Sequence, residues 1–138
     1  MVKGKKGLIL FALTAVLLSL TGCQFFADTN DIVDIHLFVN REQIDDFEYQ
    51  LDFGEEISLN VEVVDFFGQQ VNNCTVKWYV EEIGSVEPDE GYSTVFTAVK
   101  AGKDEYIEGT LDIYVESLKG AVLEESLNII VGTKPTEE

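Results

Sequence analysis

Apolar and polar residues alternate along most of this chain, and that period of two limits the fold more than any other feature of the sequence. In the first such run, Ile35 and Leu37 alternate with His36 and Phe38. A β-strand turns successive side chains to opposite faces, whereas a helical surface needs apolar residues three or four positions apart. Outside the N-terminal segment only a weak helical pattern occurs, at 41–46. The runs that alternate or are rich in β-forming residues are 33–39, 47–53, 57–63, 74–80, 92–99, 107–115 and 127–131.

Turn signals separate these runs at similar intervals. Gly54 marks one turn, and a longer break at 81–91 contains two glycines and a proline. Short strands with regular turn punctuation are typical of two sheets packed face to face. The sequence therefore predicts an all-β domain over 32–131, an antiparallel β-sandwich of about seven strands. A polar tail follows at 132–138.

The N-terminal segment has a different pattern. Three lysines near the start precede an uncharged run of 13 residues from Leu8 to Leu20. A cationic region followed by a short apolar one is the layout of a secretory signal. A membrane-spanning helix needs about 20 apolar residues, so this run is too short to span comfortably. We expect residues 1–22 to be a signal segment that is cleaved from the mature protein.

The residues around the end of this segment, Leu20, Thr21, Gly22 and Cys23, resemble the lipobox of bacterial lipoprotein precursors. The resemblance implies that Cys23 carries a diacylglycerol thioether, with fatty acids such as palmitate, and becomes the first residue of the mature chain. Each buried methylene contributes about 0.8 kcal/mol, so two or more fatty chains anchor a protein stably. The resemblance also implies a place in the cell envelope, on the outer face of the cytoplasmic membrane or in the outer membrane. By analogy with lipoprotein sorting, Gln24 favours the outer membrane.

The mature chain would be short and strongly acidic. Loss of residues 1–22 leaves 116 of the 138 residues, enough for one domain. All 26 acidic residues stay and three of the nine basic residues leave, so the formal net charge becomes −20. Such a charge repels nucleic acid and favours basic partners or divalent cations. The lipidated Cys23 and the residues to 31 form a tether of about 25 Å, at about 3.3 Å per residue, so the domain should work close to the membrane.

Few side chains in this sequence suit catalysis. The single histidine, His36, lies on the polar face of its run, so neither a histidine triad nor a multi-histidine metal site can be assembled. Carboxylate pairs such as Asp45 with Asp46 are expected by chance in so acidic a chain, and a solvated surface explains them better than a catalytic dyad. Once Cys23 carries lipid, Cys74 has no disulfide partner and is expected to be a small buried side chain. We expect no enzymatic activity.

Several segments resemble the bacterial immunoglobulin-like domains of envelope and adhesin proteins. They include a turn glycine before an alternating run, a strand that carries a core aromatic residue at Trp78, and a threonine-phenylalanine-alanine passage followed by glycine. The segments are 54–61, 64–71, 75–80, 84–86, 93–102 and 109–115. The resemblance covers about 32–131 and implies an immunoglobulin-like β-sandwich.

Calcium is the one cofactor that the composition suggests, because oxygen ligands are plentiful in the predicted loops. Their spacing does not match a twelve-residue helix-loop-helix calcium loop, so no cofactor is expected unless the tether and the loop at 104–105 converge. The candidate ligands are Glu87, Asp89 and Glu90 before one turn, Asp104 and Glu105 before another run, and Asp28, Asn30 and Asp31 in the tether.

Exposed aromatic residues are candidates for a partner-binding patch. Trp78 is not one of them, because it lies on the same face of its strand as its apolar neighbours and is expected in the core. Two of the candidates are adjacent phenylalanines at a predicted corner, and the alternative that at least one of them folds back to cap the sandwich is slightly favoured. The candidates are Phe66, Phe67, Tyr79, Tyr92 and Tyr114.

Together these observations predict a lipid-anchored envelope protein whose single domain binds a protein partner or has a structural role. Basic proteins or cationic envelope components would suit its charge. One alternative is a carbohydrate-binding module that uses the exposed aromatic residues. Another is an accessory subunit that offers an unpaired strand edge at 92–99 to a strand of its partner.

Overall fold

The computed structural model describes residues 31–136. The predicted signal at 1–22, the lipobox with Cys23, and the tether residues Asp28 and Asn30 lie outside the described residues. Within 31–136, no helix is long and apolar enough to cross a membrane.

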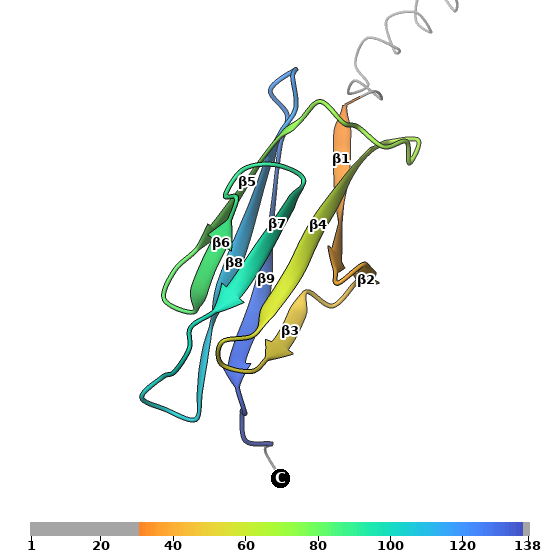
Figure 1. The fold of residues 1–138 in the computed structure, drawn as a ribbon. Coiled ribbons are helices and arrows are strands. Elements are labelled where there is room, and N and C mark those ends of the chain that lie inside the picture. Colours follow the sequence, from red (N-terminus) through yellow and green to blue (C-terminus); the bar gives the residue numbers. More distant parts are fainter. Residues whose placement is uncertain (1–30, 137–138) are drawn as a thin grey trace, which may run out of the picture.

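Two β-sheets pack face to face to form the domain, which confirms the predicted all-β sandwich (Figure 1). The strands are β1 (Ile32–Val39), β2 (Glu42–Ile44), β3 (Glu48–Leu51), β4 (Glu56–Asp65), β5 (Thr75–Val80), β6 (Gly84–Glu87), β7 (Ser93–Ala98), β8 (Tyr106–Glu116) and β9 (Val122–Gly132). The five-stranded sheet, sheet A, has the order β2-β1-β4-β7-β6. The four-stranded sheet, sheet B, has the order β3-β9-β8-β5.

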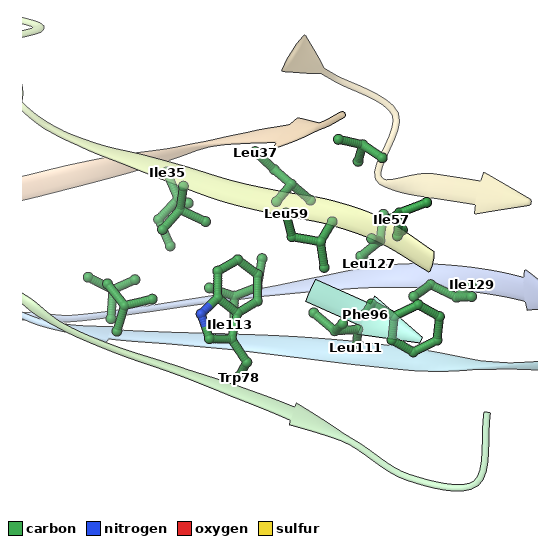
Figure 2. Close-up of a cluster of buried hydrophobic side chains, with 14 of the residues drawn as sticks. Ile35, Leu37, Ile57, Leu59, Trp78, Phe96, Leu111, Ile113, Leu127 and Ile129 are labelled. Atoms are coloured by element: carbon green, nitrogen blue, oxygen red, sulfur yellow. The ribbon is translucent and has the colours of Figure 1, made fainter. Parts of the chain in front are cut away.

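The inward side chains of both sheets meet in one apolar core (Figure 2). Phe96 of sheet A and Leu111 of sheet B are fully buried, and Trp78 is 1% exposed, as its parity predicted. Burial of a large apolar side chain stabilises the fold by about 1.5–3 kcal/mol. The indole N–H of Trp78 donates a hydrogen bond to the Gly91 carbonyl at 2.7 Å, so the polar atom of this buried ring is satisfied.

Nine strands form within residues 31–136 where about seven were expected, because two short segments also pair. The strand β2 occupies the weak helical pattern at 41–46 and pairs with β1 across a two-residue turn, Asn40 and Arg41. Both turn residues have positive φ, 49° and 74°, the conformation of tight turns that match the twist of paired strands. The strand β6 lies within the predicted break at 81–91 and pairs with β7.

One strand pair is parallel, so the expected antiparallel arrangement is wrong at this point. The strand β3 runs in the same direction as β9, with Tyr49 opposite Ile129. After β2 the chain crosses from sheet A to sheet B at 45–47, and the N–H of Asn128 donates to the Phe47 carbonyl at 2.9 Å. Since β3 reaches its neighbour by changing sheets and not through a hairpin, no tight turn forces it to be antiparallel.

The unpaired strand edge expected at 92–99 is also wrong. The strand β7 lies inside sheet A, paired with β4 on one side and with β6 on the other. The edge of sheet B at β5 is partly covered too. There the backbone N–H of Trp78 donates to the Asp89 carbonyl at 2.9 Å, and the Gly91 N–H donates to the Val76 carbonyl at 2.8 Å.

The substitution Gly84→Ala should destabilise the domain, because β6 packs closely against β7. A Cβ atom at this position would collide with the Thr97 carbonyl oxygen and would lie 2.7 Å from the Phe96 ring. Overpacking of this kind costs about 1–3 kcal/mol, which urea unfolding followed by tryptophan fluorescence would measure. The control is Ser85→Ala at the adjacent exposed position, with an expected change within about 0.5 kcal/mol. Equal stability of the two variants would contradict the packing of β6.

Candidate functional site

The corner after β4 presents two adjacent phenylalanines to solvent. Phe66 is 67% exposed and Phe67 is 66% exposed, so the favoured expectation that one of them folds back over the core is wrong. Their rings contact each other edge to face, with centroids 5.6 Å apart. The pair forms an apolar projection at the beginning of the β4–β5 loop.

The buried carboxylate of Asp65 gives this corner its shape. Its Oδ1 accepts hydrogen bonds from the backbone N–H groups of Phe67 and Gln69, both at 2.9 Å. The Asp65 carbonyl accepts from the Gly68 N–H at 3.0 Å, and Gly68 has a φ of 76°, which favours glycine. The side chain of Asp65 thus binds the backbone of the tight turn. The side chains of Phe66 and Phe67, which follow it, point outward.

Tyr92 is a structural residue beneath this loop and not part of an exposed patch. Its hydroxyl donates to the Val71 carbonyl at 2.9 Å and accepts from the Cys74 N–H at 2.9 Å. Burial raises the pKa of the Tyr92 hydroxyl and also that of the Cys74 thiol. Cys74 is half-buried against the core, in keeping with a packing role.

The remaining two aromatic candidates lie on the outer face of sheet B. Tyr79 on β5 is exposed, as its parity predicted, and Tyr114 on β8 is half-buried. Both line a shallow pocket of about 310 Å³ together with Glu124 and Ser126 of β9. The five predicted aromatic residues therefore form no single patch, because the phenylalanine corner, the half-buried Tyr92 and this tyrosine pair occupy different places.

Of the predicted calcium ligands, the two loop groups within 31–136 are not brought together, and Asp28 and Asn30 of the tether lie outside the described residues. The group Glu87, Asp89 and Glu90 precedes β7, whereas Asp104 and Glu105 follow it, so the two groups lie at opposite ends of that strand. In the described part of the chain, no group of three or more histidine, cysteine, aspartate or glutamate side chains could hold a metal ion. The sole histidine, His36, lies 3.5 Å from Asp34 on the outer side of β1.

A groove that the sequence did not reveal runs over the outer face of sheet A. It has a volume of about 640 Å³ and lies across β1, β4 and β7. Phe38 and Val95 give it an apolar floor, and Arg41 and Glu62 supply one charge of each sign. In the first alternating run Phe38 lies on the face that is otherwise polar, with Asp34 and His36. This aromatic residue on a polar face was the only sign of the groove in the sequence. Further lining residues are Ser58, Leu59, Asn60, Gln70, Pro88, Ser93 and Thr94.

Comparison with protein-family models finds no match, and comparison with curated proteins finds none either. Among solved structures, the chain is similar to a nucleoside hydrolase-related hypothetical protein from Saccharophagus degradans that is associated with carbohydrate metabolism. This match has 12% sequence identity and a TM-score of 0.47, and it covers 75% of this chain and 26% of the other. The chain thus spans only about a quarter of the solved structure, and so distant a likeness carries no argument about function.

Replacement of Asp65 should loosen the phenylalanine corner. Asp65→Ala leaves the N–H groups of Phe67 and Gln69 without their acceptor, which should cost about 1–3 kcal/mol of unfolding free energy in urea. Chymotrypsin should also cleave after Phe67 faster in this variant. Asp65→Asn keeps one side-chain oxygen as an acceptor and is expected to lose less than half as much stability. Identical behaviour of the two variants would show that the carboxylate does not shape the turn.

Removal of the Tyr92 hydroxyl should weaken the attachment of the β4–β5 loop. Tyr92→Phe loses both hydrogen bonds to that loop, with an expected cost of about 1–2 kcal/mol in urea unfolding at neutral pH. Since burial raises the pKa of Tyr92, the wild type should lose stability as the pH rises above about 10, and Tyr92→Phe should lose less. Tyr114→Phe on the sheet surface is the matched control. A pH profile unchanged by Tyr92→Phe would contradict this role.

Proposed function

We propose that this protein is a lipid-anchored envelope protein whose single immunoglobulin-like domain is a non-enzymatic binding module for a protein partner. The lipobox that ends in Cys23 supports the anchor and the location. The groove on the outer face of sheet A is the observation that carries the binding role, because it offers partly exposed apolar side chains on an otherwise polar sheet surface.

Strand order supports the immunoglobulin-like form of the sandwich. In sheet A, β1, β4, β7 and β6 follow the order A-B-E-D of immunoglobulin domains, and in sheet B, β9, β8 and β5 follow the order G-F-C. Trp78 is buried on β5, the strand that corresponds to strand C and carries the core tryptophan in that fold.

The chemistry of the groove supports a protein ligand. Protein interfaces combine an apolar centre with a polar rim, and here Phe38 and Val95 are surrounded by hydroxyl and amide side chains. One rim hydrogen bond is already made, from the Ser93 hydroxyl to Asn60 Oδ1 at 2.6 Å. The high negative charge of the whole domain favours a partner with basic surface and speeds their encounter.

A glycan is the second candidate ligand for the same groove. An aromatic ring bordered by amide, hydroxyl and guanidinium groups suits a sugar, because the ring covers its apolar face while polar groups bind its hydroxyls. Phe38, with Asn60, Gln70 and Arg41, provides this combination.

Site-specific crosslinking in intact cells tests the proposal. A photoreactive residue at Val95, inside the groove, should give one specific crosslinked protein that mass spectrometry can identify. The same residue at Glu124, exposed on the outer face of sheet B, is the matched control and should give a yield lower by roughly tenfold, as expected for a position outside the interface. The Cys23→Ser form should lose the product, because it is not retained at the membrane.

Other outcomes separate the candidates. Crosslinks from Val95 to polysaccharide and not to protein would show that the ligand of the groove is a glycan and would overturn the protein partner. Equal and diffuse products from both positions would contradict a binding role for the groove.

A further inference from the structure

We propose that the end of the sandwich where the lipidated N-terminal segment 23–30 joins it docks on the membrane that carries the lipid anchor. The docking surface, called the apolar end, comprises the corner at Phe66 and Phe67 and the β8–β9 turn at Leu118. The inference rests on the proposed lipidation of Cys23. It adds an orientation of the domain on the membrane, which a lipid on a short tether does not impose by itself.

Exposed apolar side chains gather at this end of the molecule. Leu118 is 78% exposed, more than either phenylalanine of the corner. Apolar side chains of this kind enter the boundary between headgroups and acyl chains, to a depth of about 5–10 Å in known interfacial segments. In residues 31–136 seven large hydrophobic side chains are exposed, and five of them lie at the apolar end: Val33, Phe66, Phe67, Leu118 and Val122.

Strand pairing places these residues together at one end. Ile32, the first residue of β1, pairs with Asp65, which directly precedes the phenylalanine corner. Thr75, which follows the corner loop, pairs with Glu116, which directly precedes the β8–β9 turn. The chain from the N-terminal segment therefore joins the domain at the same end as the corner and the turn, the upper end in Figure 1.

Hydrogen bonds hold both projections in place. Asp65 shapes the corner as described above. In the β8–β9 turn, Ser117 Oγ accepts from the Ala121 N–H at 3.1 Å and the Ser117 carbonyl accepts from the Gly120 N–H at 3.0 Å, which leaves Leu118 at the tip. A flat bilayer can contact two separate projections at once, so it fits this arrangement better than a partner with a single pocket.

The two loops of the apolar end carry little charge themselves, although the exposed carboxylates of Asp34 and Glu116 lie on the strands beside them. Residues 66–76 contain no charged side chain, and Lys119 is the only charged residue in 117–123. At the opposite end, the turns at 52–56 and 81–82 hold five carboxylates. The strand β8 has 11 residues and so extends about 37 Å, at about 3.4 Å per residue, several times the Debye length of about 8 Å. Repulsion between those carboxylates and anionic lipids is therefore screened.

The length of the chain outside the structure brings the apolar end within reach. Eight residues separate Cys23 from Ile32, and an extended chain spans at most about 3.6 Å per residue, or about 29 Å. The attachment point thus keeps this end nearer to the bilayer than the opposite end, and a membrane surface is always present at high local concentration.

Depth-dependent fluorescence quenching tests this orientation. The lipidated mature protein, which begins at Cys23, would be placed in vesicles of phosphatidylethanolamine and phosphatidylglycerol that contain brominated acyl chains. Tryptophan introduced by Phe66→Trp or Leu118→Trp should lose roughly half of its emission, because brominated chains quench only indoles that reach the acyl boundary. The signal of Trp78, buried in the core, is subtracted by measuring the parent protein in the same vesicles.

The control is Lys103→Trp, at an exposed position in the β7–β8 loop at the opposite end. It should show no quenching beyond that of the parent. Equal quenching at positions 66, 118 and 103, or none at any of them, would overturn the proposed orientation. Blue-shifted emission from the Phe66→Trp variant in the absence of lipid, with doubled mass by light scattering, would assign the corner to a second copy of the chain and would also overturn it.

Mass spectrometry of the N-terminal peptide separates this inference from the function on which it rests. An unmodified Cys23 would overturn the anchor and the orientation together. A lipidated Cys23 with an unquenched apolar end would leave the proposed function intact and overturn the orientation alone.

Discussion

Burial of alternate side chains between two sheets is the constraint on which the rest of this structure depends. Cys74, the only cysteine in the described residues, is unpaired, so the apolar core stabilises the sandwich without a disulfide. Trp78 shows how much one residue contributes. Its ring fills the core, its indole N–H binds the Gly91 carbonyl, and its backbone N–H binds the Asp89 carbonyl along the edge of β5. Since the inward positions are occupied in this way, the outward positions and the loops are available for function.

The period of two predicted most of the inward and outward positions in the long strands, but Val33, expected on the apolar face of its run, is 49% exposed where the ladder shifts between Ile32 and Asp34. It assigned Trp78 to the core and Tyr79 to the surface, and both assignments are confirmed. It did not predict β2 or β6, because strands of three and four residues are too short to show a period. The missing β6 led in turn to the wrong edge at 92–99, since pairing is a property of two segments and not of one sequence run.

Loop residues do not alternate between two faces as strand residues do, so the sequence does not show which loop side chains point outward. This explains why the candidate sites were harder to predict. The direction of Phe66 and Phe67 is decided by the hydrogen bonds of Asp65, a neighbour that the sequence shows only as one more carboxylate in an acidic chain. Tyr92 is removed from the aromatic candidates by two hydrogen bonds to backbone 18 and 21 residues away. The groove was visible only as Phe38, an aromatic residue on a polar face, because its other walls come from distant strands.

The acidity of the chain is compatible with a position at a membrane surface because the charge is unevenly placed. A domain with a uniform charge would be repelled by anionic lipids on every side, whereas here the uncharged loop at 66–76 and the carboxylates of the far turns lie at opposite ends. In the proposed orientation the long strands point away from the bilayer surface. The groove across β1, β4 and β7 then faces sideways, along the membrane, and is not covered by it. A partner would then approach from the side, guided by carboxylates that extend beyond the lipid headgroups.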